Sequence, residues 1–210
     1  MNRALIPGVI AMCAIVTASN ILVQFLAGPW LTWGAFTYPF AFLVNEIVNR
    51  LQGPAAARKV VLAGFAAGVA CSAIGTQIQG DFGPLVTARV AMASGTAFLC
   101  AQLLDIAIFD RMRRQAWWRA PLAADLFGSA LDTALFFSIA FSASLAFLAP
   151  SVDVAWANEA LPILGMGPVA PLWVSLALAD LGVKLGLAAF ALFPFRIITL
   201  RLIARRQAAE

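Results

Sequence analysis

The chain has 210 residues, of which 62% are hydrophobic and 11% charged, with a mean hydropathy of +0.90 and a formal net charge of +4. A soluble domain has about 25% charged residues, so this chain cannot bury its apolar surface in one core, and a soluble protein is excluded. The aromatic residues lie within hydrophobic runs, apart from the basic residues, which excludes nucleic-acid binding.

Six hydrophobic runs are long enough to cross a bilayer, which takes about 20 mainly apolar residues. They predict an all-α integral membrane protein. The length leaves no room for a separate soluble domain, so we expect a single transmembrane domain over residues 1–210. The expected helices cover about residues 5–27, 33–51, 57–79, 85–108, 121–148 and 170–200.

The basic residues set the expected orientation, because short cytoplasmic loops are enriched in Lys and Arg. If six helices alternate in direction, every Lys and Arg except Arg89 and Lys184 lies on the same side as both termini. The opposite connections contain Asp81, Asp153 and Glu159, and neither Lys nor Arg. The sequence therefore predicts a multi-pass protein with both termini in the cytoplasm.

The second expected helix is interrupted by Pro39, which suits the first turn of a helix and blocks its continuation backwards. A helix that begins at Pro39 and ends near Leu51 is about 20 Å long, which is too short for a hydrocarbon layer of about 30 Å. Residues 29–38 would then re-enter the membrane as irregular backbone. Many transporters build a substrate site from such a broken helix. A kinked, continuous helix is the alternative.

Ionisable residues at membrane depth usually serve a function. In the second helix, Glu46 lies beside Asn45 and one turn from Arg50. A Glu46–Arg50 pair that reaches the membrane surface is the structural alternative. In the fourth helix, Gln102 and Asp105 share one side of the helix, and Asp105 is close enough to the end to be only interfacial.

The remaining deep residues lie on helices one, four, five and six. Asn20 shares a stripe with other polar residues of the first helix, and Arg89 is the one arginine of the outer half. Asp132 follows Asp125 at helical spacing, and Asp180 and Lys184 are one turn apart, so an ion pair is the alternative to a functional role. We expect these groups to meet in an interior cavity with a net charge of −1, counted over Glu46, Arg89, Asp132, Asp180 and Lys184.

Catalysis and metal binding are not expected. The chain has no histidine, and Cys13, Cys71 and Cys100 stand alone in apolar runs, so no metal site or cofactor is predicted. Asp125 and Asp132 lie on one helix about 10 Å apart by rise, too far to share a proton as an aspartyl dyad does.

Several sequence motifs resemble those of a known family. They are TASN (17–20), TWGAFTYPFAFLVNEIVNRLQG (32–53), ARVAMASGTAFLCAQLLDIAIFDRMR (88–113), WW (117–118), LFGSALDTALFFSIAF (126–141) and LADLGVK (178–184). Together they span nearly the whole chain, which resembles the queuosine-precursor transporter (VUT) family of the bacterial inner membrane. The resemblance implies uptake of 7-cyano- or 7-aminomethyl-7-deazaguanine. The family often has aspartate at the position of Glu46.

The chemistry of a deazaguanine suggests roles for the candidate residues. A carboxylate, either Glu46 or Asp132, would accept the ring N–H and the exocyclic amine as a bidentate pair. Its carbonyl would take a donor from Arg89, Lys184, Gln102 or Asn20, and its flat face would stack on an aromatic ring. Asn45 and Asp180 complete the predicted site, and the stacking candidates are Phe36, Tyr38 and Phe40.

The sequence leaves the kind of importer and the oligomeric state open. The chain could instead be the substrate-binding membrane subunit of a multi-component, vitamin-type importer, because six helices and a small size fit both kinds of protein. A homodimer within the lipid bilayer is also compatible with the sequence, and nothing in it demonstrates one.

Overall fold

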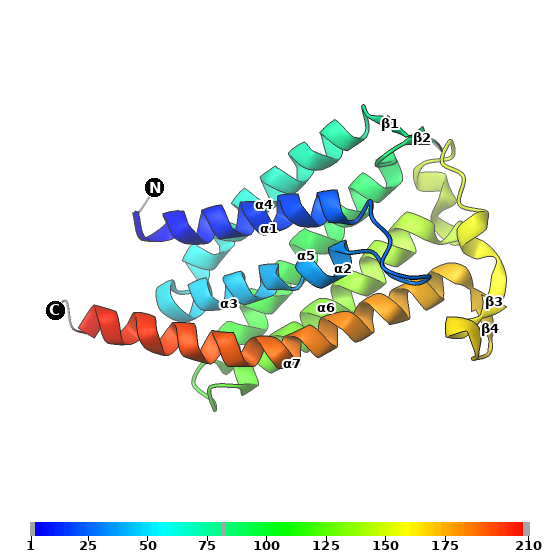
Figure 1. The fold of residues 1–210 in the computed structure, drawn as a ribbon. Coiled ribbons are helices and arrows are strands. Elements are labelled where there is room, and N and C mark those ends of the chain that lie inside the picture. The colour runs from blue at the N-terminus through cyan, green and yellow to red at the C-terminus, as the bar shows by residue number, and fades with distance from the viewer. Residues whose placement is uncertain (1–2, 81–82, 208–210) are drawn as a thin grey trace.

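The apolar runs form long helices that lie side by side along one axis (Figure 1). The computed structural model describes residues 3–80 and 83–207, so Asp81 lies outside the described residues. The fold confirms an all-α membrane protein. Its α-helices are α1 (Ile6–Leu22), α2 (Gly34–Thr37), α3 (Phe40–Gln52), α4 (Pro54–Gly75), α5 (Ala88–Met112), α6 (Arg119–Phe141) and α7 (Leu172–Gln207).

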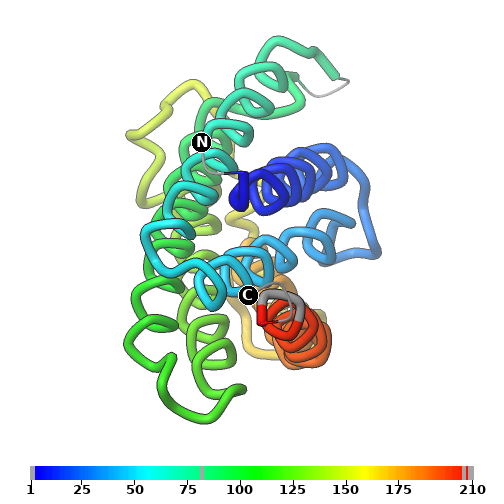
Figure 2. The backbone as a smooth tube through the Cα atoms, turned by 90° about the vertical axis from the view of Figure 1, so that its left-hand side faces the viewer, coloured from blue at the N-terminus to red at the C-terminus, as the bar shows by residue number. Residues whose placement is uncertain are grey.

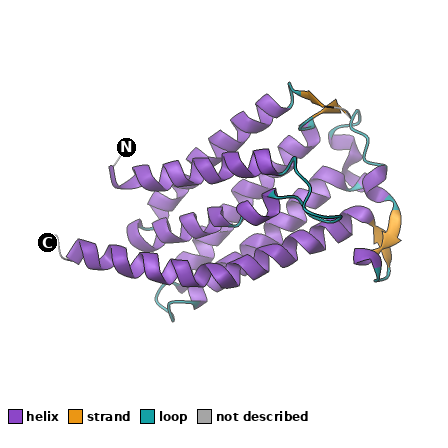
Figure 3. Cartoon of the chain, viewed as in Figure 1, coloured by secondary structure: helices purple, strands orange, loops and turns teal. Residues whose placement is uncertain are grey.

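Short elements connect the long helices at the end of the bundle away from the termini (Figure 3). Two small antiparallel sheets lie there, β1 (Gln79–Gly80) with β2 (Gly83–Pro84) and β3 (Ala160–Pro162) with β4 (Val169–Pro171). The 3₁₀ helices are Arg3–Leu5, which leads into α1, and Ala143–Leu148, Trp156–Asn158 and Ile163–Gly165, which precede α7.

Within the described residues, 5 helical segments are long and apolar enough to cross a membrane. They are Arg3–Leu22, Pro54–Gly75, Ala88–Met112, Arg119–Phe141 and Leu172–Ala204. The other expected span is the α2–α3 segment, in which α3 has only 13 residues. Six complete crossings and cytoplasmic termini therefore stay predictions, although α1 begins and α7 ends at the same end of the bundle (Figure 1).

The helix is distorted at Pro39, in a form closer to the continuous alternative than to a break, because the backbone stays helical through Tyr38 and Pro39. Pro39 precedes the first residue of α3 and has no N–H for a helical bond. The N–H groups of Ala41 and Phe42 donate to the carbonyls of Tyr38 and Pro39 at 2.9 and 3.1 Å, the tighter spacing of a 3₁₀ turn. Tyr38 and Pro39 keep helical dihedral angles, so α3 continues in the direction of α2 (Figure 1).

Several expected boundaries are wrong. The irregular backbone covers residues 23–33, where residues 26 and 32 form an isolated bridge, and not residues 29–38; the first helix therefore ends before residue 27. The fifth expected helix ends at Phe141 because Ser142 is extended. The last expected helix continues to Gln207, since residues 201–207 are rich in helix-favouring Arg, Leu and Ala.

The helices form two layers, seen almost end-on in Figure 2. One layer contains α4, α5 and α6, and the other contains α1, the α2–α3 segment and α7. Helix α3 lies between α1 and α7 and also packs on α4 and α5. Its polar residues consequently face the interior between the layers.

The close approach of α2 to α1 depends on Gly34. A Cβ atom at this position would lie 3.0 Å from the Val23 backbone nitrogen and 3.1 Å from the Ser19 backbone oxygen. Backbone atoms cannot move aside as a flexible side chain can, so only glycine fits here without a shift of one element.

We predict that Gly34→Ala lowers the free energy of unfolding by about 1–3 kcal/mol, because it overpacks this contact. Thermal unfolding in detergent measures the effect. The control is Gly182→Ala in α7, where a Cβ would meet nothing within 4 Å; this change should be neutral or slightly stabilising. Equal melting temperatures for the two variants would contradict the prediction.

Candidate functional site

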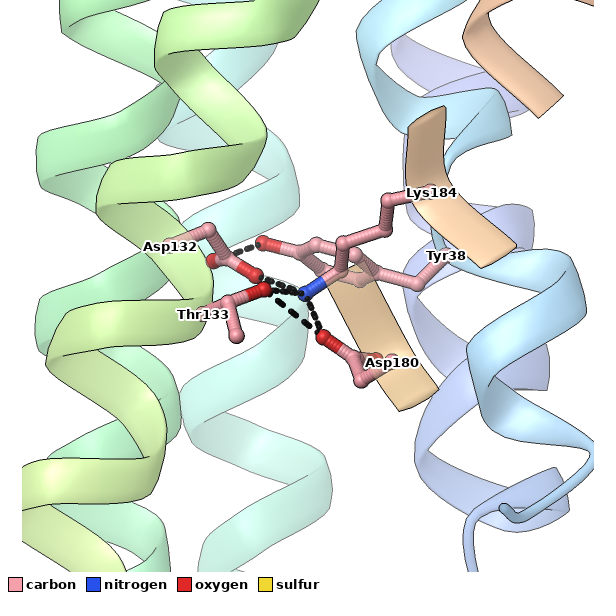
Figure 4. A network of polar contacts seen from close by, with 5 residues as sticks. All are labelled: Tyr38, Asp132, Thr133, Asp180 and Lys184. Atoms are coloured by element: carbon pink, nitrogen blue, oxygen red, sulfur yellow. Dashed lines mark hydrogen bonds and ion pairs between the residues drawn. The ribbon is translucent and has the colours of Figure 1, made fainter. Parts of the chain in front are cut away.

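A buried lysine holds together side chains from three segments (Figure 4). The Lys184 Nζ atom of α7 lies 2.6 Å from Asp132 Oδ2 of α6 and 2.5 Å from Asp180 Oδ2 one turn earlier on α7. It also donates to Thr133 Oγ1 at 3.1 Å, and the Thr133 hydroxyl donates to Asp180 Oδ2 at 2.8 Å. The Tyr38 hydroxyl donates to Asp132 Oδ1 at 2.9 Å. We call these five residues the lysine network.

Tyr38, which lies at the interruption between α2 and α3, connects the α2–α3 segment to this network. Its ring lies 5.4 Å from Lys184 Nζ, a cation–π distance, and packs edge-on against Phe42 and Phe98. The lysine network therefore links the interrupted segment to α6 and α7 in the interior of the bundle.

A second polar group lies further along the bundle and contains no cation. Its acidic cluster consists of Glu46 on α3, Asp105 on α5 and Asp125 on α6, which are 1%, 0% and 4% exposed. The helices that carry these residues meet here, because Asn45 of α3 bonds to Asp105 and Gly128 of α6 lies against Phe42 and Asp105. None of the ion pairs found among the described residues involves the three carboxyl groups, so their charges are not balanced by a neighbouring Lys or Arg.

Two buried amides border the acidic cluster. Asn45 donates to Asp105 Oδ1 at 3.4 Å and to the Gln102 backbone carbonyl at 3.3 Å. Among the described residues, the buried polar atoms without a hydrogen-bond partner include Glu46 Oε1, Asn45 Oδ1, Asp105 Oδ2 and both amide atoms of Gln102. An unpaired buried polar group costs about 1–3 kcal/mol, so this group is suited to a ligand that supplies the partners.

Gly128 allows the helices around the acidic cluster to come together. A Cβ atom on this α6 residue would lie 2.9 Å from the Phe42 ring and 3.6 Å from Asp105 Cβ. The missing side chain lets α6 approach both α3 and α5 and thereby places Asp125 near Glu46 and Asp105.

The expectation that all the deep charged residues share one cavity is wrong. Asp132, Asp180 and Lys184 form the lysine network, whereas Glu46 belongs to the acidic cluster. Arg89 belongs to neither, because its Nε atom donates to the Ile139 carbonyl at 2.6 Å and another guanidinium nitrogen donates to the Ser142 carbonyl. Periodicity places a residue on a face of its helix, but it does not identify the helix that packs there.

The other candidate residues are distributed as follows. Asn20 donates to the Val16 carbonyl of its own helix at 2.9 Å. Phe36 packs against Trp33, and Phe40 lines a small cavity beside Asp125. Arg50 donates to the Arg113 carbonyl at 2.7 Å, so the alternative of a Glu46–Arg50 pair is absent from the described structure.

Three residues were missing from the predicted site. Asp105 is expected at the membrane interface and Asp125 has no role in the predicted site, yet both are buried in the acidic cluster. Their helical spacing from Gln102 and Asp132 was the available signal. Thr133 gave no signal, since a threonine in a membrane helix commonly bonds its own backbone.

Sequence similarity relates the chain to a known family and to individual proteins. Residues 32–199 match a family described as "putative vitamin uptake transporter". The "Queuosine precursor transporter" of Escherichia coli K12 is 38% identical over 142 residues, which cover 60% of this chain and 64% of that protein. The "Probable queuosine precursor transporter" of Haemophilus influenzae Rd is 38% identical over 121 residues, 52% of each chain. The matches thus span about half to two thirds of these relatives. No solved structure matches significantly.

We predict that Lys184→Met destabilises the protein by about 3–5 kcal/mol, because it leaves two buried carboxyl groups without their cation. Thermal unfolding in detergent measures this. The double variant Lys184→Met/Asp180→Asn should be more stable than the single variant, since the coupled groups are not additive. Lys59→Met, at an exposed position of α4, is the control. A double variant less stable than Lys184→Met would contradict the pairing.

Proposed function

Because the chain belongs to the vitamin uptake transporter family, we propose that it imports 7-deazaguanine precursors of queuosine across the bacterial inner membrane. The family match covers residues 32–199, and two relatives at 38% identity are named as transporters of queuosine precursors. These names favour a transporter over a substrate-binding subunit of a larger importer, and over an enzyme.

The single observation that supports a substrate site is the set of unpaired polar atoms around the acidic cluster. A 7-deazaguanine presents a ring N–H and an exocyclic amine side by side and carries a carbonyl next to them. The Glu46 carboxylate would accept the two donors as a bidentate pair. The Gln102 amide, whose nitrogen and oxygen both lack partners, would donate to the carbonyl and accept from a further N–H group.

Neighbouring groups complete the proposed site. Asn45 Oδ1 is a further acceptor beside Asp105, and the ring of Phe40, close to Asp125, offers a face for stacking. The ammonium group of the aminomethyl precursor would find counter-charges in Asp105 and Asp125. Asp132 and Asp180 both pair with Lys184, so we place these three residues outside direct contact with the base.

The proposed site is closed in this conformation, since Glu46, Asn45 and Gln102 are at most 1% exposed. Entry of a flat base therefore requires one wall of the site to move. The interruption at Pro39 lies at one end of α3, which carries Glu46 and Asn45. A change in the angle between α2 and α3 would open the site without breaking the long helices.

We predict that Glu46→Gln lowers uptake of labelled 7-cyano-7-deazaguanine about 10- to 150-fold at limiting concentration. The change replaces one oxygen of the bidentate acceptor with a donor, and a charged hydrogen bond contributes about 1.5–3 kcal/mol. Uptake into liposomes that contain only the purified protein measures this, with guanine and adenine as competitors that test selectivity.

The matched control is Glu159→Gln, at an exposed connection residue, which should leave uptake unchanged. Equal uptake by Glu46→Gln and the unmodified protein would refute the site. No uptake by the purified protein, restored by an ATPase partner, would refute the proposed autonomous transporter.

A further inference from the structure

We propose that the carboxyl pair Asp132 and Asp180 binds one proton in each transport cycle, so that import is coupled to proton movement. This inference rests on the proposed function. It concerns a different part of the molecule from the substrate site, because the lysine network lies on α6, α7 and the α2–α3 interruption.

The lysine network has an unbalanced negative charge. Two carboxylates and one ammonium group sum to −1, and the side chains of Asp132, Asp180 and Lys184 are only 6%, 13% and 4% exposed. A net charge inside a membrane protein is costly because the surroundings have a low dielectric constant. One proton on the carboxyl pair brings the network to zero while Lys184 keeps its own charge.

Within residues 3–80 and 83–207, no second Lys or Arg pairs with either carboxylate of the network. Helix α6 contributes Thr133, and the interrupted segment contributes Tyr38, whose ring packs edge-on against Phe98 of α5. Among the described residues, Lys184 is the only cation paired with either carboxylate. The nearest acid along α6 is Asp125, about 10 Å away by helical rise. A proton is therefore the simplest balancing charge.

Proton binding would also change a hydrogen bond of the interrupted segment. The Tyr38 hydroxyl now donates to Asp132 Oδ1. A proton on that oxygen makes it a donor, so Tyr38 must rotate its hydroxyl to accept or lose the bond. The proton enters from the side that faces the incoming precursor, resides on the carboxyl pair and leaves on the other side. The α2–α3 segment would thus respond to the same event that neutralises the network.

The test uses liposomes with the purified protein, labelled 7-cyano-7-deazaguanine, which is neutral, and a membrane voltage clamped at zero. With about one pH unit of gradient, acid outside, one proton per precursor drives an accumulation of about tenfold. A pH-sensitive dye should report proton entry when the precursor is added. Without a pH gradient, the internal and external concentrations should become equal.

Two variants should abolish this accumulation while exchange of labelled for unlabelled precursor stays measurable. Asp132→Asn and Asp180→Asn each leave one carboxylate with Lys184, a neutral pair for which a further proton would create a net charge. Asp110→Asn, at a half-exposed carboxylate paired with Arg113, is the matched control and should accumulate the precursor as the unmodified protein does.

The outcomes separate the two proposals. Downhill uptake by the unmodified protein without gradient-driven accumulation overturns proton coupling and leaves the proposed function standing. Full accumulation by both Asn variants overturns the assignment to this carboxyl pair. Absence of uptake under every condition contradicts the proposed function and proton coupling with it.

Discussion

A polar group surrounded by hydrocarbon must find its partner within the protein, and this requirement organises the interior of the bundle. The lysine network meets it with two carboxylates, one ammonium group and two hydroxyls, which lie between α6, α7 and the α2–α3 segment. Arg89 meets it only in part, because two of its nitrogens donate to backbone carbonyls at the end of α6 and its Nη1 atom has no partner. The acidic cluster does not meet it, since several of its buried atoms have no partner. The contrast distinguishes side chains that are paired within the protein from side chains whose atoms are available to a solute.

Helix α6 connects the two polar regions. Asp125 faces the acidic cluster, and Asp132, two turns later, faces Lys184. The α2–α3 segment also reaches both, through Glu46 and Tyr38. Occupation of one region can therefore influence the other through two separate elements, which is a physical basis for coupling a solute to an ion.

The sequence predicted the helices well because their apolar runs are long, and it located the interruption because proline lacks an N–H. It also identified Glu46, Asp132, Asp180 and Lys184 as interior residues, and all of them except Asp180 are almost fully buried. The partners of these residues could not be predicted. Arg89 and Ser142 are separated by 53 residues, and no local pattern indicates that the beginning of α5 binds the end of α6. The burial of Asp105 likewise depends on Gly128, whose lack of a side chain matters only once α6 is in place.

The contact between Arg89 and the end of α6 has a consequence for how such a molecule changes shape. It joins α5 to the last carbonyls of α6, while Gly128 lets the same two helices pack closely near the middle of α6. Two such contacts favour movement of α5 and α6 as one unit. If transport tilts one layer of the bundle against the other, the layer of α1, α2–α3 and α7 is the one with a short, proline-containing helix at which its shape can change.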